Sequence, residues 1–146
     1  MEQACRIRKA EARDLDTIFS FICHLEETSF PREPFEEVYG ENIENPDYEY
    51  LVAVNETDEV IGFLSCHGQK LLHHAGMVFE IQELYVARHH RGSGTGRLLM
   101  KALEERLNKI KYKSLEVTTN LMRTDARKFY TKLGFVATHQ KLVTIL

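Results

Sequence analysis

The chain has 146 residues, of which 43% are hydrophobic and 28% are charged, a composition typical of one globular domain. A formal net charge of −3 gives no general attraction for nucleic acid, and no apolar run approaches the ~20 residues that a membrane-spanning helix needs. We therefore expect a single domain over residues 1–146 that binds neither nucleic acid nor a membrane.

The first third of the chain predicts one strand and two helices. A short edge strand is expected at Cys5–Ala10, and apolar residues at helical spacing predict a helix that starts at Asp14. A weaker apolar stripe predicts a second helix whose first turn follows Pro34, because proline is favoured at the start of a helix. Pro46 is expected to end that segment.

Three β-rich segments follow, with a loop before the last of them. The segments Tyr48–Val54 and Val60–His67 flank a polar cluster of hairpin length, so they predict two antiparallel strands. Residues Gly68–Gly76 are expected to form a loop, and Met77–Val86 a third long strand. Since no long helix separates these strands, they should pair antiparallel.

The last third predicts two helices and their neighbouring strands. Leucines at helical spacing predict a helix that starts in a glycine cluster and carries Ile110 on its apolar face. A strand is expected at Ser114–Thr119, then a helix that Gly134 ends, and then one or two strands over Phe135–Leu146. The predicted fold is α/β, an antiparallel meander that leads into one β-α-β crossover.

A glycine-rich segment joins the third long strand to the helix with the strongest pattern. Its glycines allow a tight turn, the helix N-terminus offers unpaired N–H groups, and Arg91 and Arg97 add positive charge, which together suit a pyrophosphate. A P-loop would need a lysine after the last glycine, and a dinucleotide-binding turn would need G-x-G-x-x-G. The sequence therefore does not favour a nucleotide-dependent oxidoreductase.

The segment Arg91–Gly96 resembles the Q/R-x-x-G-x-G/A signature of the GNAT superfamily of N-acetyltransferases. Phe129–Phe135 is similar to a second signature of that superfamily, F-Y-x-x-x-G-F, and the order of elements agrees along the whole chain. Within the superfamily, the chain resembles the bacterial aminoalkylphosphonate N-acetyltransferases. The residues that carry this likeness are Leu72, His73, His74, Glu80 to Leu84, Asn120, Arg123, Asp125, Ala126, Phe129 and Tyr130.

The resemblance implies a mixed, mostly antiparallel sheet that is splayed where acetyl-CoA enters and is flanked by about four helices. It implies acetyl transfer from acetyl-CoA to the primary amine of a small molecule, by direct attack in a ternary complex. The more common pattern has an asparagine where this chain has Arg123, so Asn120 is the candidate replacement. The residues expected to contact acetyl-CoA are Leu84, Tyr85, Val86, Arg91, Gly92, Ser93, Gly94, Thr95, Gly96, Arg97 and Asn120.

Three side chains are candidates for proton transfer. Tyr130 lies where superfamily members commonly have a tyrosine near the coenzyme sulfur, and a phenol can protonate a thiolate. Glu80 resembles, by its offset from Val86, a glutamate that related enzymes use as general base. Strand alternation puts Glu80 and Glu83 on opposite faces, but a bulge would reverse that relation and make Glu83 the base. Core packing is the alternative for Tyr130, and a solvated or structural role for the two glutamates.

Four side chains are candidates for contact with the acceptor. Arg123 and Arg32 could meet phosphonate oxygens through paired hydrogen bonds, and His73 and His74 could contact the same group. Adjacent histidines on an extended segment point in opposite directions, so we expect no metal site. The alternatives are helix capping or solvation for the arginines and an ordinary polar loop for the histidines.

Three widely spaced cysteines, Cys5, Cys23 and Cys66, fit neither a disulfide framework nor a zinc ribbon. We expect reduced thiols, no covalent relay through cysteine, and a cytoplasmic protein that is a monomer or a homodimer. The alternative function is a GNAT-fold module that binds acetyl-CoA without turnover.

Overall fold

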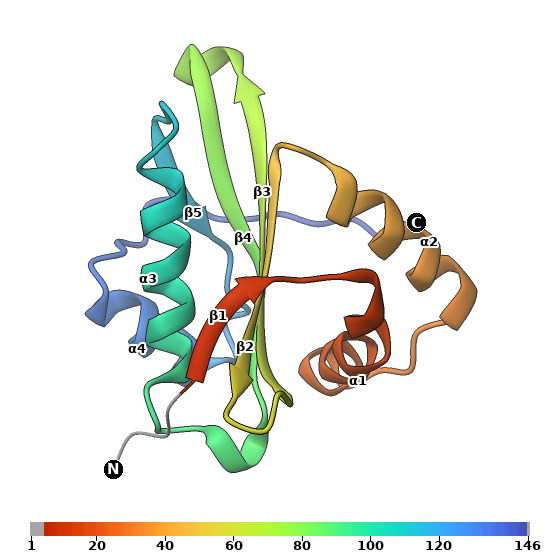
Figure 1. Cartoon of the computed structure of the whole chain (residues 1–146). Helices are drawn as coiled ribbons and strands as arrows, with labels where there is room; N and C mark the ends of the chain where they lie inside the picture. Colours follow the sequence, from red (N-terminus) through yellow and green to blue (C-terminus); the bar gives the residue numbers. More distant parts are fainter. Residues whose placement is uncertain (1–4, 146) are drawn as a thin grey trace.

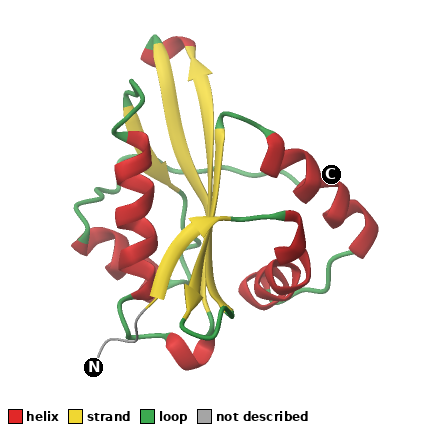
Figure 2. Ribbon diagram, in the orientation of Figure 1, coloured by secondary structure: helices red, strands yellow, loops and turns green. Residues whose placement is uncertain are grey.

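In the computed structural model, which describes residues 5–145, a five-stranded sheet separates two pairs of helices (Figure 1). The strands lie in the order β1 (Cys5–Lys9), β2 (Tyr48–Asn55), β3 (Val60–Leu71), β4 (Gly76–Val86) and β5 (Ser114–Val117). Helices α1 (Leu15–Glu26) and α2 (Arg32–Glu44) lie on one side, and α3 (Thr95–Leu107) and α4 (Thr124–Lys132) on the other (Figure 2). Short 3-10 helices occur at Ala12–Asp14, Leu72–His74 and Arg88–His90.

The sheet is antiparallel from β1 to β4, and β4 pairs with β5 in parallel. The parallel pair needs a crossover, which α3 provides. The predicted α/β fold, its edge strand at the N-terminus and its single β-α-β crossover are therefore confirmed. No helix among residues 5–145 is long and apolar enough to cross a membrane.

Each face of the sheet carries its own core. On the α3 side, Leu99 and Leu103 are fully buried in one cluster with Leu64 of β3. On the α1 side, Ile18 packs in a second cluster with Phe63, the neighbour of Leu64 in sequence. Successive residues of β3 thus point to opposite cores, as a strand covered on both faces requires. Each buried side chain of this size stabilises the fold by ~1.5–3 kcal/mol.

The β3–β4 hairpin is longer than predicted, and the expected Gly68–Gly76 loop is reduced to residues 72–75. Gly68 lies inside β3, where its N–H donates to the carbonyl oxygen of Asp47 at 2.8 Å. A Cβ at this position would lie 2.6 Å from a ring carbon of Phe79. Glycine is required here by close packing rather than by a turn, and that requirement is not visible in the sequence.

Two predicted helix boundaries differ from the structure. The second helix begins at Arg32, so Pro34 lies within its first turn, where the N–H that proline lacks has no intrahelical partner to lose. The third helix ends at Leu107, and Ile110 lies beyond it, partly exposed, so its predicted place on the apolar face is wrong.

The end of α4 agrees with the prediction, whereas the segment after it does not. Gly134 has φ +97°, and the N–H of Phe135 donates to the carbonyl oxygen of Tyr130, a pattern that ends a helix. The predicted strands over Phe135–Leu146 are absent from residues 135–145, and Leu146 lies outside the described residues. The apolar residues there favour a strand, but the structure gives them no partner strand.

Candidate active site

Strand β4 contains a bulge that decides which way its glutamates face. Glu80 pairs with His67 and Glu83 with Ser65, so two residues of β4 lie opposite one residue of β3, and Gln82 is the extra one. Paired residues share a face of the sheet, and Ser65 and His67 alternate on one face of β3. Glu80 and Glu83 therefore face the same side, that of α1 and α2.

A cavity of about 210 Å³ lies on that side, between α1, α2 and the sheet. Ile18, Phe35 and Phe63 form part of its apolar wall, and Gln82 and Glu83 line it at β4. No lysine or arginine of the described chain lines it. Of the two glutamates named as candidate bases, the structure brings Glu83 to this cavity and leaves Glu80 outside its lining.

The Glu83 carboxyl group is held by Ser65. The Ser65 hydroxyl donates a short hydrogen bond to Glu83 Oε1, and the Glu83 N–H donates to Ser65 Oγ at 3.0 Å. Burial raises the pKa of the Glu83 carboxyl, the hydrogen bond from Ser65 opposes that effect, and the negative charge of Glu26 adds to it. A carboxylate whose pKa is raised is a better match for taking a proton from an ammonium group.

Glu80 lies on the same strand as Glu83, but the bulge at Gln82 separates it from the glycine-rich segment. It is half-buried, and the Gln82 side-chain amide donates to its Oε1 at 3.4 Å and to its carbonyl oxygen at 3.3 Å. These contacts suit a structural role that positions Gln82 beside the cavity.

Three polar side chains at the cavity form a chain of hydrogen bonds that local sequence patterns do not predict. Asn42 Nδ2 donates to the Tyr50 hydroxyl at 2.8 Å, which leaves the hydroxyl proton for His67 Nε2, 3.1 Å away. Burial raises the pKa of Tyr50 to about 12 and lowers the pKa of His67, so both groups are uncharged near pH 7. The signal available in the sequence is the pair Ser65 and His67, polar residues that alternate within an apolar strand.

Along the edge of β4 that pairs with β5, the sheet opens. Strand β5 pairs with β4 from Val78 to Ile81 only, and no described strand continues the pairing along Leu84, Tyr85 and Val86. Main-chain groups of β4 are therefore open to an extended ligand there, the arrangement by which an added strand is recognised. The splayed sheet expected from the resemblance is thus present.

The glycine-rich segment lies directly after this open edge. Gly92 and Gly94 have φ +81° and +88°, and Gly94 precedes α3 without a side-chain cap, so the first N–H groups of α3 have no capping partner. A Cβ on Gly92 would meet nothing within 4 Å, so conformation rather than space calls for glycine. Arg97 is exposed on the first turn of α3.

Arg91 turns back toward β4 instead of toward the glycines. Its Nε donates to the carbonyl oxygen of Val86 at 3.0 Å, and its guanidinium group lies 5.2 Å from the centre of the Tyr85 ring. The Arg91 side chain thus lies against the end of β4, where the open edge of that strand meets the glycine-rich segment.

Tyr130 packs on the opposite face of the sheet from Glu83. It is 7% exposed and belongs to the same buried cluster as Ile81, with Leu84 and Val117 packed against that cluster. Burial raises the pKa of its phenol to about 12, and within the described chain its hydroxyl has no hydrogen-bond partner. The phenol therefore keeps its proton at neutral pH, close to where β4 and β5 separate.

The loop between β5 and α4 carries the next two candidates. Asn120 Oδ1 accepts a hydrogen bond from the N–H of Met122, so its side chain shapes the turn. Arg123 reaches α1, where its Nη2 donates to the carbonyl oxygen of Leu25 at 2.8 Å and lies 3.5 Å from Glu26. Since Glu26 also influences the Glu83 carboxyl, Arg123 lies on the Glu83 side of the sheet.

The other candidates for acceptor contact lie elsewhere. His73 and His74 occupy the tip of the β3–β4 hairpin, ~33 Å from the end of β4 at ~3.3 Å per residue. Arg32 forms ion pairs with the exposed side chains of Asp16 and Glu36 and does not line the cavity. The structure does not bring these three residues to Glu83.

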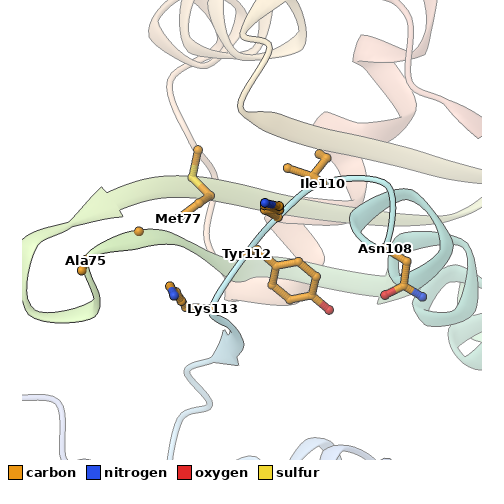
Figure 3. Close-up of a pocket in the computed structure, with 8 residues that line it drawn as sticks. Ala75, Met77, Asn108, Ile110, Tyr112 and Lys113 are labelled. Atoms are coloured by element: carbon orange, nitrogen blue, oxygen red, sulfur yellow. The ribbon is translucent and has the colours of Figure 1, made fainter.

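A second, larger hollow of about 580 Å³ lies beside the start of β4 (Figure 3). Side chains of Met77, Tyr112 and Lys113 line it, from β4 and from the segment that joins α3 to β5. None of the predicted site residues is among its lining residues.

Two kinds of chemistry find no support in the described residues. No three His, Cys, Asp or Glu side chains between residues 5 and 145 group so as to hold a metal ion. All three cysteines are free, and burial raises the pKa of the Cys66 thiol to about 12, which keeps it from acting as a thiolate nucleophile.

Comparison with known proteins identifies relatives along almost the whole chain. Residues 15–135 match the model of the Acetyltransferase (GNAT) family. The chain is 32% identical over 142 residues to the aminoalkylphosphonate N-acetyltransferase of Salmonella typhimurium, a match that covers 97% of this chain and 92% of that protein.

Solved structures share the fold. A transcriptional regulator from Bacillus halodurans C-125 superposes with a TM-score of 0.88 at 24% identity, covering 98% of this chain and 100% of that one. The ribosomal-protein-alanine N-acetyltransferase of Brucella melitensis biovar Abortus 2308 gives a TM-score of 0.79 at 17% identity, covering 98% and 99%.

Proposed function

Because this chain belongs to the acetyltransferase (GNAT) family and is an acetyl-transferring enzyme, we propose that it acetylates the primary amine of a small molecule by direct attack in a ternary complex. The observation that carries the proposal is the position of Glu83. It lines a cavity on one face of the sheet beside the point where β4 and β5 separate, while Tyr130 packs against that point from the other face.

Acetyl-CoA fits the residues between the open edge of β4 and α3. Its pyrophosphate would lie on the main chain of Gly92–Gly96, where positive φ angles and an uncapped helix N-terminus favour an anion. Its pantetheine arm would lie along Leu84–Val86, with Arg91, Arg97 and Asn120 at the edges. When bound, acetyl-CoA supplies a thioester, whose C–S bond breaks as the new C–N bond forms.

Glu83 would act as the general base. Small amines enter largely as ammonium ions, so one proton must leave before the nitrogen can attack. Glu83 takes that proton in the cavity, and the hydrogen bond from Ser65 keeps the carboxylate oriented. Glu80 remains a candidate for a supporting role, because it faces the same side without lining the cavity.

Tyr130 would act as the general acid. The departing thiolate, whose conjugate acid has a pKa of ~8.5, needs a proton. The Tyr130 phenol, with a pKa of about 12, is protonated at neutral pH and can supply it. The attacking nitrogen loses a second proton as the amide forms, and that proton returns through solvent to the tyrosinate, which completes the balance of protons.

The acceptor class that we propose is the aminoalkylphosphonates. The Salmonella relative has that name, and Arg123 offers a guanidinium group on the Glu83 side of the sheet. The placement of Arg32, His73 and His74 supports no contact with an acceptor at Glu83. We further propose that residues 1–146 act as one domain in the cytoplasm, in line with the continuous sheet and the three free thiols.

The test is the release of coenzyme A thiol from acetyl-CoA with five amines: aminomethylphosphonate, 2-aminoethylphosphonate, a polyamine, an aminoglycoside and a lysine peptide. We expect release with the two phosphonates and much slower release with the others. Release with another amine alone would keep the acetyltransferase and discard the phosphonate class. No thiol release with any of the five amines, despite measured binding of acetyl-CoA, would contradict the proposal and favour a module that binds acetyl-CoA without turnover.

A further inference from the structure

His67 lies in the cavity of Glu83 but has no part in the chemistry described above. It lines that cavity from β3, on the face of the sheet that also carries Glu83. The next residue of β3 on that face is Ser65, which holds the Glu83 carboxyl group and lies ~7 Å from His67 along the strand. A ligand group bound by His67 would therefore lie close to one bound by Glu83.

Two tyrosines of β2 hold the His67 ring in place. The ring stacks on that of Tyr48, with centroids 3.7 Å apart and planes 6° apart. The Tyr50 ring is nearly parallel to it at a centroid distance of 5.8 Å. The orientation of the two ring nitrogens is therefore set before a ligand enters, which lowers the entropic cost of binding one.

The hydrogen bonds of the chain Asn42–Tyr50–His67 run in one direction. Asn42 donates to the Tyr50 hydroxyl, and that hydroxyl donates to Nε2 of His67. Because burial lowers the pKa of His67, the ring has one proton near pH 7, and a ring whose Nε2 accepts a hydrogen bond carries that proton on Nδ1. Among residues 5–145, Nδ1 of His67 has no hydrogen-bond partner.

The hydroxyl donors at the cavity are already used within the protein. The Tyr39 hydroxyl donates to the carbonyl oxygen of Glu11 at 2.6 Å, and the Tyr50 hydroxyl donates to His67. Much of the remaining wall is apolar, with Ile18 and Phe35 among its side chains. An oriented N–H in such a cavity suits an oxygen atom of a ligand, because a few placed polar groups fix the orientation of a ligand in a mostly apolar site.

We propose that the Nδ1–H of His67 donates a hydrogen bond to a phosphonate oxygen of the acetyl acceptor, and that Asn42 and Tyr50 position the ring by fixing which nitrogen carries the proton. This inference rests on the proposed function, because it places the amine of the acceptor at Glu83. In an aminoalkylphosphonate the amine and the oxygens are a few bonds apart, so both can be bound on one face of β3 and β4. A phosphonate has three oxygens, so contacts with Arg123 and His67 are compatible.

Kinetics with two amines of similar size test the contact. His67→Phe keeps a flat ring against Tyr48 and removes the donor, so KM for 2-aminoethylphosphonate should rise ~10–100-fold. KM for propylamine, which has no oxygen, should change little. His67→Asn keeps an N–H donor near the position of Nδ1 and should recover part of the loss. The matched control is His24→Phe, at an exposed position of α1 outside the cavity lining, and it should leave both KM values unchanged.

Histidine ¹⁵N NMR tests the same inference without turnover. The His67 signals, identified by their loss in His67→Phe, should show a proton on Nδ1 and none on Nε2 in the free wild type. Tyr50→Phe should shift the ring toward the other tautomer, an effect that a merely structural role of Tyr50 would not produce. In the presence of coenzyme A, 2-aminoethylphosphonate should move the Nδ1 signal, and propylamine should not.

The two measurements separate this inference from the proposed function. A phosphonate that moves the Nδ1 signal but is not acetylated would leave the His67 contact standing and overturn the proposed function. Acetylation of the phosphonate with an unchanged KM in His67→Phe, or with equal changes for both amines, would overturn the His67 contact alone. A proton on Nε2 of the wild type, or a His67 signal that the phosphonate does not move, would also overturn it.

Discussion

Glu83 illustrates how one extra residue in a strand decides which way the following side chains face. Without the bulge at Gln82, Glu83 would face α3 and Glu80 would face the cavity side alone. The bulge turns Glu83 to the side of α1 and α2, where burial raises its pKa and Ser65 holds it. Of the two candidate bases, Glu83 is therefore the one that lines the cavity.

The hydrogen bond from Ser65 favours the charged form of Glu83, so its removal should change the pH dependence of catalysis. Ser65→Ala leaves burial and Glu26 to raise the pKa of the Glu83 carboxyl further. Because a base acts when deprotonated, the acidic limb of kcat/KM should move to higher pH. Below the limb, kcat/KM should fall ~10-fold for each pH unit by which the limb moves. Steady-state rates from about pH 5 to 9 check this, and a limb that stays in place or moves to lower pH would contradict it.

Tyr130 allows a test of the general acid with little structural disturbance. Its hydroxyl has no hydrogen-bond partner in the described chain, so Tyr130→Phe should leave the free energy of unfolding nearly unchanged. We expect kcat to fall by ~10²-fold, the lower range for loss of an acid–base group. Tyr112→Phe is the matched control, since Tyr112 packs edge-on against Phe79 away from the open edge, and kcat should not change. Equal kcat in wild type and Tyr130→Phe would refute the assignment.

At the scale of elements, local sequence patterns predict the regular parts well and the exceptions poorly. The start of the helix that follows the glycine-rich segment, the β2–β3 hairpin and the end of α4 at Gly134 all follow from such patterns. From the sequence, the bulge is one alternative to regular strand alternation, because strand register depends on a partner strand that local pattern does not determine. The pattern places Gly68 in a loop, whereas close packing against Phe79 keeps it in β3.

The two environments of glycine give predictions of opposite sign. Gly68→Ala places a Cβ 2.6 Å from a Phe79 ring carbon and 2.8 Å from the Asp47 carbonyl oxygen, and should destabilise the fold by ~1–3 kcal/mol. Gly40→Ala, within α2 and with nothing within 4 Å, should stabilise it by ~0.5–1 kcal/mol. Urea unfolding measures both. The same sign for both substitutions would contradict the packing described for β3.

For the whole molecule, element order is enough to predict an α/β fold with one crossover, and the family resemblance adds the splayed sheet. The segment after α4 has the pattern of a strand, but within residues 5–145 it pairs with no strand. Local pattern reports a preference for extended structure but does not determine whether a partner strand is within reach. Likewise, residues 98 apart meet where Arg123 donates to Leu25, a contact that no local pattern predicts.

That contact links the last quarter of the chain to α1, a helix that also lines the cavity at Glu83. If Arg123 meets the phosphonate, Arg123→Ala should raise KM for 2-aminoethylphosphonate by ~10–100-fold, the effect of hydrogen bonds to a charged group. KM for an uncharged amine of similar size, such as propylamine, should change little. Arg123→Lys keeps the charge without the paired donors, so its KM for 2-aminoethylphosphonate should lie between those of the wild type and Arg123→Ala. Equal losses for both amines would assign Arg123 a purely structural role.

The proposed role of Glu83 as the general base is tested most directly by a paired comparison of kcat/KM for Glu83→Gln and Glu80→Gln, measured as coenzyme A release with the best acceptor. Both substitutions remove one charge from the same face of β4, so each controls for the other. We predict a loss of ~10²–10⁴-fold for Glu83→Gln and less than ~10-fold for Glu80→Gln. The larger loss in Glu80→Gln, or equal losses in both, would contradict Glu83 as the base.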